Sequence, residues 1–310
     1  MKDHVYIIGA GAIGKALAVF LQLNGRQVTL LRGSEDTGAA YTETITVKLE
    51  DREVEASIHI NSLSNFRSID GIIVLTCKSF GNERLASLIK IKTENSPVVL
   101  LQNGLGVEKP FTNLGFKTVY RCVLFVTSQV LEDGVVRFKP VAACPIGTVA
   151  GNHAQLNVIV EQLTTAYFTF SSEPDIQRVI WKKAIANCVF NSVCPLLEVD
   201  NGIFHRNDTA LDIANRIIAE CLIIAAAKSV TLTHEEVLES LLRISRFSDG
   251  QLISTLQDIR LGRRTEIETL NLAITEMAKE LGMAHLVTET RILGEMTRLK
   301  SELSRLQPQI

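Results

Sequence analysis

The chain has 310 residues, of which 46% are hydrophobic and 21% are charged, and its formal net charge is −2. This length predicts about two domains, and the composition is that of an ordinary globular protein. Because this charge balance offers no basic surface, nucleic acid and anionic membranes are not expected as partners. The 6 cysteines form no C-x-x-C pair and no zinc-type spacing with histidine, so we expect reduced thiols and no metal site.

The first motif along the chain is a glycine-rich turn between an apolar strand, residues 5–8, and a helical pattern that ends near Leu23. In such a turn the first glycine allows a sharp bend, the second lets backbone N–H groups approach a pyrophosphate, and the third lets helix and strand pack closely. The pyrophosphate then lies at the helix N-terminus, where unpaired N–H groups favour negative charge. Gly25 and a second strand at residues 27–31 complete a βαβ unit. The sequence therefore predicts a dinucleotide site formed by Gly9, Ala10, Gly11, Ala12, Ile13 and Gly14.

Residues 5–23 are also apolar enough to suggest a signal peptide or a membrane span as the alternative. Lys15 interrupts this stretch and glycines lie within it. Neither a small-residue cleavage site nor an uninterrupted apolar run of about 20 residues follows. We therefore expect a cytoplasmic protein.

The first half of the chain alternates short apolar runs with turn signals and helical patterns. Residues 45–49 and 54–60 have the pattern of a β-hairpin inserted in the sheet. Residues 71–77 and 97–101 are continuous apolar runs, which are typical of parallel strands buried on both faces. A parallel sheet with intervening helices is the predicted architecture of this half.

The second half is predicted to be helical. Residues 172–175 have the make-up of a helix start, and a helical pattern then runs through Trp181 to Val193, before Pro195. The chain is helical almost throughout from Asp208, with a polar tail at 301–310 that we expect to fray. The fold class is therefore α/β, with an N-terminal Rossmann-like dinucleotide-binding domain (residues 1–170) and a C-terminal all-helical domain (residues 171–310).

The end of the second strand indicates which dinucleotide binds. NAD enzymes place an acidic side chain near this point for the ribose 2′-hydroxyl, whereas an arginine favours the 2′-phosphate of NADP. The strand ends here at Arg32, whose charged fork suits a phosphate, and Ser34 offers a hydroxyl. A solvated surface arginine is the alternative, and the nearby Glu35 and Asp36 argue against phosphate binding. NADP(H) is the favoured cofactor.

Polar residues follow two of the buried strands, where open α/β sheets bind their ligands. Lys78 follows the run 71–77, and the segment Gln102-Asn103-Gly104-Leu105-Gly106 follows the run 97–101. A solvent-exposed lysine and a simple Asn-Gly turn are the alternatives. The position of both beside one nucleotide motif favours Lys78 and Asn103 as site residues.

The predicted helix at 181–193 carries Lys183, Asn187 and Asn191, which are spaced four residues apart and therefore share one face. The surrounding residues are mostly apolar, so these polar groups need partners, and a ligand is one such partner. A plain polar stripe on the helix is the alternative. Farther along, Ser254, Asp258 and Arg260 precede two carboxylates, and spacing alone does not rank Glu266 above Glu268.

The whole chain resembles the ketopantoate reductase (2-dehydropantoate 2-reductase) family. The resemblance rests on short motifs in the family's order and spacing, namely GAGAIG at 9–14, Lys78, QNGLG at 102–106, WKKAIANCVFN at 181–191 with Asn201-Gly202, and STLQDIRLGRRTEIE at 254–268. It implies NADP(H)-dependent reduction of ketopantoate, a 2-oxo acid, to pantoate in pantothenate synthesis.

The resemblance also implies a role for each site residue. Lys183 corresponds to the general acid, and Glu266 to the carboxylate in the network that joins Lys183, the substrate and the nicotinamide ribose. Asn103 would lie between nicotinamide and substrate, and Lys78 would contact the cofactor. The substrate-binding positions are Asn187, Asn191, Asn201 and Ser254.

Two departures from the family pattern bear on which substrate is used. Residues 125–130 are bulkier than the small residues usual there, and a proline expected near residues 285–288 is absent. A reductase for another 2-oxo acid is therefore one alternative. A non-catalytic NADP-binding sensor is a second alternative, against which the presence of Lys183 and Glu266 argues. A homodimer is compatible with the sequence, which does not fix the oligomeric state.

Overall fold

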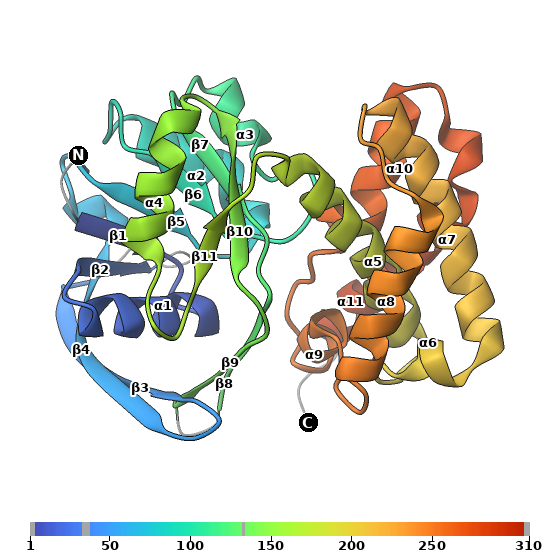
Figure 1. Cartoon of the computed structure of the whole chain (residues 1–310), viewed down its shortest axis with the longest axis horizontal. Coiled ribbons are helices and arrows are strands. Elements are labelled where there is room, and N and C mark those ends of the chain that lie inside the picture. The colour runs from blue at the N-terminus through green and yellow to red at the C-terminus, as the bar shows by residue number, and fades with distance from the viewer. Residues whose placement is uncertain (1–3, 33–37, 132–133, 307–310) are drawn as a thin grey trace. The chain divides into compact units, whose positions relative to one another are not determined.

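The computed structural model describes residues 4–32, 38–131 and 134–306, and the chain divides into two compact units (Figure 1). The first unit comprises Met1–Gln102 and Val107–Ile176, and the second comprises Asn103–Gly106 and Gln177–Ile310. The short segment 103–106 thus packs with the helical unit although it lies between two elements of the first. The domain boundary near residue 170 stays a prediction.

The first unit contains one mixed β-sheet, which in the described ranges has the strand order β11-β10-β7-β6-β5-β1-β2-β4-β3-β9-β8. Its parallel centre consists of β7 (Val119–Cys122), β6 (Val98–Leu100), β5 (Ile72–Leu75), β1 (His4–Ile8), β2 (Gln27–Arg32) and β4 (Glu53–Ser62). From β1 the chain order proceeds outward in both directions. Ligands bind at such a switch point, at the carboxyl ends of the strands.

Both faces of the parallel centre are buried, as the continuous apolar runs predict. Val5 and Ile7 of β1 belong to a core with α1 (Ala12–Leu23) and α4 (Leu156–Leu163). Tyr6 and Ile8 belong to a second core with α2 (Asn82–Lys90) and α3 (Lys109–Asn113). The alternation along one strand therefore fills two separate cores.

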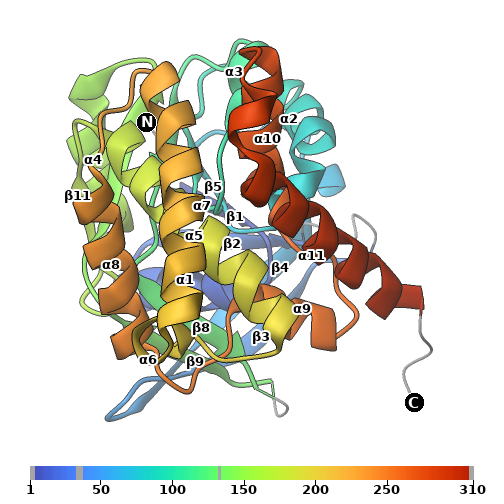
Figure 2. The ribbon, with the colours of Figure 1, turned by 90° about the vertical axis from the view of Figure 1, so that its right-hand side faces the viewer.

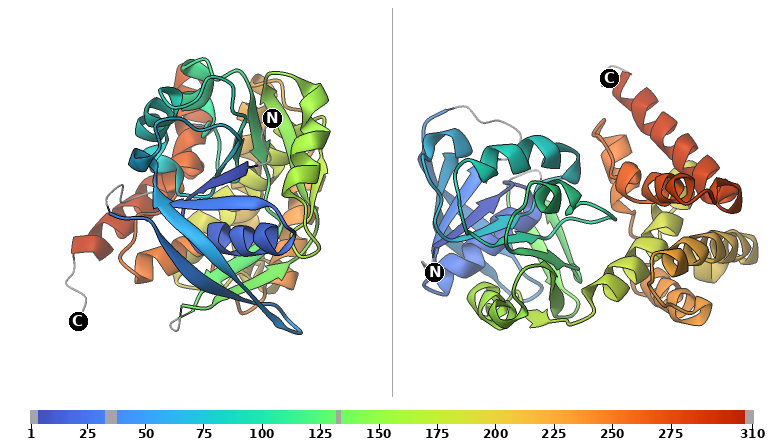
Figure 3. Two further views of the ribbon diagram at one scale, coloured as in Figure 1. Left: turned by 90° about the vertical axis from the view of Figure 1, so that its left-hand side faces the viewer. Right: turned by 90° about the horizontal axis from the view of Figure 1, so that it is seen from above.

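Two hairpins extend the sheet beyond β2. The predicted hairpin is confirmed as β3 (Tyr41–Lys48) paired antiparallel with β4, the long blue pair of strands in the left view of Figure 3. The second hairpin, β8 (Val126–Val130) with β9 (Val136–Pro140), was not predicted, and β9 pairs with β3. The bulky segment at 125–130 therefore forms an edge strand. At the other edge, β10 (Cys144–Ala150) pairs with β11 (Phe170–Ser172).

The second unit is helical, as predicted. It is built from α5 (Ile176–Leu197), α6 (Ile203–Arg206), α7 (Asp208–Ala227), α8 (His234–Phe247), α9 (Ser254–Arg260), α10 (Asn271–Glu280) and α11 (Thr288–Leu306), with α10 and α11 side by side in Figure 2. A buried run from Ala184 to Ala186 and from Cys188 to Pro195 makes α5 the central helix of the unit.

Two predictions about helix ends were wrong. The helix at 181–193 does not stop before Pro195 but continues through it to Leu197, with the Pro195 carbonyl accepting a hydrogen bond from Lys300 Nζ at 2.8 Å. The tail does not fray from Ser301, because α11 continues to Leu306 and Ser301 is only 3% exposed. Residues 307–310 lie outside the described part of the chain.

None of the cysteines, which all lie within the described ranges, forms a disulfide, and every one except Cys77 is buried. No helix among the described residues is both long and apolar enough to cross a membrane. The same residues contain no cluster of three or more His, Cys, Asp or Glu side chains that could hold a metal ion.

Candidate active site

The glycine-rich turn between β1 and α1 has the backbone geometry that its sequence predicts. Gly9 has φ +124°, and a Cβ there would lie 2.4 Å from the Cys77 backbone nitrogen. A Cβ on Gly14 would lie 1.9 Å from the Gly9 carbonyl oxygen, so the helix approaches the turn more closely than any side chain allows. Gly11 is exposed, with nothing within 4 Å of its Cβ position.

The N-terminus of α1 is open to an anion. Its N-cap is Gly11, which offers no side-chain cap, and its first turn holds no acidic residue. The N–H groups of this turn thus lack the side-chain acceptors that commonly cap a helix. Thr76 stabilises the turn, because its hydroxyl donates a hydrogen bond to the Gly9 carbonyl at 2.8 Å. This arrangement fits the pyrophosphate of a dinucleotide.

Arg32 ends β2 at the same edge of the sheet, but part of its guanidinium is already engaged. Its Nη2 donates to Ser62 Oγ at 2.5 Å and to the carbonyl oxygens of Gly38 and Ala39 at 3.2 and 3.4 Å. The guanidinium carbon also lies 5.6 Å from the centre of the Tyr41 ring. These contacts hold the side chain in one orientation while leaving it partly exposed. Ser34, Glu35 and Asp36 lie outside the described residues.

Lys78 follows β5, and its backbone is fixed by an amide network that the sequence reasoning missed. Gln102, which follows β6, donates from Nε2 to the Cys77 carbonyl at 2.9 Å and exchanges two 2.8 Å hydrogen bonds with the side chain of Asn82. Arg121 donates to the Gln102 carbonyl at 3.3 Å and forms a buried ion pair with Glu108. An arginine inside the apolar run 119–123 is the sequence signal that identifies such a buried pair.

Within the second unit, the segment that carries Asn103 packs against the turn that carries Glu266. The Leu105 N–H donates to the Thr269 carbonyl at 2.7 Å. Gly104 has φ +97°, and a Cβ there would lie 2.2 Å from Thr269 Oγ1. Thr269 in turn donates from its hydroxyl to the Glu266 carbonyl at 3.0 Å. These two predicted site segments are therefore in contact.

Helix α5 presents Lys183 and Asn187 one turn apart, and both side chains are half-buried. Asn191, the next residue on this face, is only 3% exposed, and both ends of its amide have protein partners. Its Nδ2 donates to the Asn187 carbonyl at 3.0 Å, and its Oδ1 accepts from Thr255 Oγ1 at 2.6 Å. Asn191 therefore joins α5 to α9, next to the exposed Ser254.

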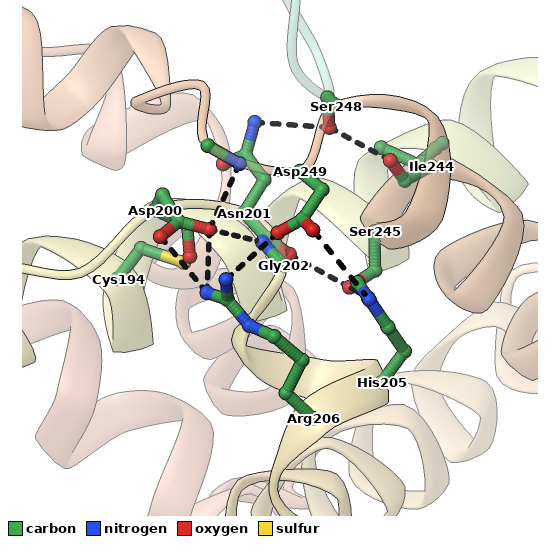
Figure 4. Close-up of polar contacts among 11 residues, drawn as sticks. Cys194, Asp200, Asn201, Gly202, His205, Arg206, Ile244, Ser245, Ser248 and Asp249 are labelled. Atoms are coloured by element: carbon green, nitrogen blue, oxygen red, sulfur yellow. Dashed lines mark hydrogen bonds and ion pairs between the residues drawn. The ribbon is translucent and has the colours of Figure 1, made fainter.

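Asn201 lies in the loop between α5 and α6, inside a polar network (Figure 4). Its backbone N–H donates to the Gln251 carbonyl at 2.9 Å, and its carbonyl accepts from Ser245 Oγ at 2.7 Å. Its Nδ2 donates to Ser248 Oγ at 3.1 Å, whereas its buried Oδ1 has no hydrogen-bond partner among the described residues. Two of the polar groups of Asn201 thus bind the loop that leads into α9, and its carbonyl binds Ser245 near the end of α8 (His234–Phe247).

The charged part of this network consists of Asp200, Arg206 and Asp249, which we call the polar clamp (Figure 4). Arg206 Nη2 contacts both carboxylate oxygens of Asp200, at 2.7 and 2.8 Å, and its Nη1 lies 2.9 Å from Asp249 Oδ1. The Arg206 guanidinium and the N–H groups of Gly202 and Gly250 lower the pKa of Asp200 to about 2. Sequence reasoning missed the clamp, because no local spacing links residues 206 and 249.

A family model described as "Ketopantoate reductase PanE/ApbA" matches residues 5–151, and one described as "Ketopantoate reductase PanE/ApbA C terminal" matches residues 175–296. The two models describe one family and together match most of the chain. The chain belongs to the ketopantoate reductase family.

This ketopantoate reductase family member is similar to other proteins along nearly its whole length. A 2-dehydropantoate 2-reductase of Pyrococcus horikoshii is 29% identical over 284 residues, which are 89% of this chain and 90% of the relative. The crystal structure of a PanE/ApbA family ketopantoate reductase from Ralstonia eutropha JMP134 has a TM-score of 0.84 at 22% identity and covers 97% of this chain and 99% of its own.

A D-mandelate dehydrogenase in a ternary structure with NADH and anilino(oxo)acetate is as similar in fold. Its TM-score is also 0.84, at 23% identity, and it covers 98% of this chain and 100% of its own. At these identities, the solved structures establish the fold that this ketopantoate reductase family member shares with them. They leave the roles of Lys183, Glu266 and the other site residues as predictions.

Proposed function

We propose that the protein is a 2-dehydropantoate 2-reductase, which uses NADPH to reduce ketopantoate to pantoate in pantothenate biosynthesis. The observation that carries the proposal is the match of both family models, combined with the placement of Lys183 and Asn187 one turn apart on the central helix α5. The curated relative in Pyrococcus horikoshii supports the same reaction, since its name gives that activity.

The geometry of the first unit supports a nicotinamide dinucleotide as the cofactor. Gly9, Gly11 and Gly14 leave room at an uncapped helix N-terminus for a pyrophosphate, and Arg32 offers a cation at the end of β2. Lys78 is assigned to the same cofactor. The bound cofactor supplies the hydride for carbon 2 of the 2-oxo acid.

The residues of the second unit supply the remaining chemistry. As hydride arrives, negative charge grows on the carbonyl oxygen, and we assign to Lys183 its stabilisation and then its protonation. Glu266 is assigned to orient Lys183 together with the cofactor ribose. Asn103, Asn187, Asn201 and Ser254 are assigned to hold the acid so that its carbonyl carbon faces the hydride donor.

Asn191 is the assigned substrate-binding residue that the structure supports least. Both ends of its amide are bonded to Asn187 and Thr255 and the residue is only 3% exposed, so little of the amide is open to a substrate. The contacts of Asn191 support a structural role, in which it holds α9 against α5.

The test is loss of NADPH absorbance by the purified protein with ketopantoate as substrate. The proposal expects ketopantoate to have the highest kcat/KM in a panel with 3,3-dimethyl-2-oxobutanoate, which lacks only its hydroxyl, and phenylglyoxylate. Because a D-mandelate dehydrogenase shares the fold at the same TM-score, preference for phenylglyoxylate would support a reductase of another 2-oxo acid. NADPH binding without turnover of any acid in the panel would support a sensor.

A further inference from the structure

We infer that the polar clamp of Asp200, Arg206 and Asp249 positions the acid substrate by fixing the loop of Asn201 relative to Ser254. This inference rests on the proposed function, which assigns substrate binding to Asn201 and Ser254. The three clamp residues act through these two residues, so they are positioning residues and not catalytic ones.

A single carboxylate holds the two loops together. Asp200 Oδ1 accepts the N–H of Gly202 at 2.7 Å, on the loop of Asn201, and the N–H of Gly250 at 3.2 Å, on the loop before α9. The hydrogen bond from the Asn201 N–H to the Gln251 carbonyl adds a second connection between the same loops. The position of Asn201 relative to the start of α9 therefore depends on this carboxylate.

Arg206, the last residue of α6, connects the two carboxylates of the clamp. Its guanidinium binds Asp200 on one loop and Asp249 on the other, so one cation attracts two carboxylates that would otherwise repel each other. The side chains of Arg206 and Asp249 are 43% and 44% exposed. Ion pairs this exposed contribute little to global stability, so removing Arg206 is expected to loosen the loops without unfolding the unit.

The absence of a side chain at Gly202 leaves the space that Asp249 and Arg206 occupy. A Cβ on Gly202 would lie 1.8 Å from Asp249 Oδ1 and 2.9 Å from the guanidinium carbon of Arg206. Gly202 has φ −69° and ψ −11°, which any residue can adopt. The glycine is thus required by the approach of Asp249 and Arg206, and not by the backbone conformation.

Loss of the clamp should affect substrate binding more than the chemical step. The hydrogen bond between Thr255 and Asn191 independently holds the start of α9 against α5, the helix that carries Lys183. Without the clamp, α9 keeps this connection while the loop of Asn201 loses its charged anchor. The expected result is a higher KM for the acid with kcat largely retained.

The experiment compares Arg206→Met and Arg206→Lys with the unmodified full-length protein. Arg206→Met should raise the KM for ketopantoate by about ten- to a hundredfold, the effect of losing one hydrogen bond to the charged acid, while the KM for NADPH stays unchanged and the protein stays folded with a modestly lower melting temperature. Arg206→Lys should restore part of the lost affinity, because it keeps the charge but not the two-sided fork.

The matched control is Arg216→Met, which removes another exposed arginine of the same unit, paired with Glu289 at 3.3 Å. An equal rise in KM in this control, or no rise in Arg206→Met, would overturn the inference while the proposed function stands. If the unmodified protein reduces no 2-oxo acid, the proposed function fails, and amide hydrogen exchange decides about the clamp. Faster exchange at Asn201, Gly202 and Gly250 in Arg206→Met but not in Arg216→Met then supports it, and equal exchange overturns it.

A second variant tests the steric part of the inference. Gly202→Ala should raise the KM for ketopantoate in the unmodified background, because the new methyl group pushes Asp249 and Arg206 away. In an Asp249→Ala background the carboxylate that the methyl group meets first is gone, so adding Gly202→Ala should have a much smaller effect. Equal effects in both backgrounds would contradict the clamp geometry.

Discussion

At the scale of single residues, the proposed chemistry depends most directly on Lys183. It is half-buried on α5, a helix whose residues 184–186 and 188–195 are buried. We expect Lys183→Ala to lower kcat by about 10²–10⁴-fold, the usual contribution of a positioned general acid. NADPH affinity and the melting temperature should not change, since the dinucleotide motif lies in the other unit. Steady-state kinetics and fluorescence titration with NADPH measure both, and near-normal turnover would assign the acid to another residue.

Arg32 is expected to set the cofactor preference. With Nη2 bound to Ser62 and two carbonyl oxygens, the guanidinium is held in place. We expect its remaining donors to bind the 2′-phosphate of NADPH, where NADH offers only a hydroxyl. A charge-assisted hydrogen bond contributes about 1.5–3 kcal/mol, or roughly ten- to a hundredfold in affinity. Arg32→Ala should therefore remove most of the preference for NADPH while leaving NADH binding nearly unchanged. Dissociation constants for both cofactors test this, and equal affinities in the unmodified protein would refute it.

Asp200 should give the second unit a measurable sensitivity to acid. Its pKa is about 2 in the folded state against 3.8 for an ordinary aspartate, chiefly because of the hydrogen bond from Arg206. A lowered pKa means that the ionised form stabilises the fold fully above about pH 4, and that this stabilisation is lost as the pH falls toward 2. Asp200→Asn should lower the melting temperature at pH 7, and the difference from the unmodified protein should shrink between pH 4 and pH 2. A constant difference across this range would show that Asp200 does not titrate in this way.

At the scale of secondary-structure elements, α11 reverses the usual arrangement of a surface helix, because its small and polar side chains are buried and its large apolar side chains are exposed. Its buried positions are small or hydroxyl-bearing (Thr290, Gly294, Thr297 and Ser301), whereas Ile292, Met296, Leu299, Leu303 and Leu306 are exposed. Small buried side chains allow α11 to approach α10 closely. A Cβ on Gly294 would lie 2.7 Å from Asn271 Cβ and 3.1 Å from Leu272 Cδ2.

Gly294→Ala should therefore destabilise the protein although alanine has the higher helix propensity. Overpacking typically costs about 1–3 kcal/mol, which exceeds the gain of about 1 kcal/mol from replacing a glycine within a helix. Glu295→Ala, at the next and exposed position, is the matched control and should change stability by less than about 0.5 kcal/mol. Urea unfolding measures both variants. A Gly294→Ala protein as stable as the unmodified one would show that α11 can move away from α10.

The same helix shows why some elements could not be predicted from sequence. The hairpin at 45–60, helix α1 and the buried strands follow local patterns, and these were predicted within a few residues. The continuation of α11 past Ser301 depends on small side chains that are buried only because α11 packs with α9 and α10. Helix α5 likewise continues through Pro195, whose carbonyl accepts a hydrogen bond from Lys300 of α11. Neither pattern is local.

For the site, sequence identified the segments but not the contacts between them. The glycine turn was predicted to its individual glycines, because each steric requirement lies within a few residues along the chain. By contrast, the clamp depends on an approach of residues 200–206 to 249–250, and the Asn191–Thr255 hydrogen bond joins residues 64 positions apart in sequence. Such pairs are determined by tertiary packing, which spacing does not encode.

At the scale of the whole molecule, the proposed reaction requires groups from both compact units. The dinucleotide motif, Arg32 and Lys78 belong to the first unit, whereas Asn103, Lys183, Asn201, Ser254 and Glu266 belong to the second. A reaction that uses both sets should couple the binding of cofactor and acid. We therefore expect NADPH to increase the affinity for a 2-oxo acid, and the acid to increase the affinity for NADPH by the same factor.

Ser254→Ala tests whether acid binding can be weakened without weakening NADPH binding. Ser254 is exposed at the start of α9, so its hydroxyl is available to the carboxylate of the acid. Its removal should weaken binding of the acid by about 1–3 kcal/mol, or roughly five- to 150-fold, with NADPH affinity almost unchanged in the absence of acid. Titration calorimetry with each ligand alone and with the other present measures all four constants. An acid that binds the cofactor-free protein as tightly as the NADPH complex would refute the coupling, and unchanged acid affinity in Ser254→Ala would refute the role assigned to that serine.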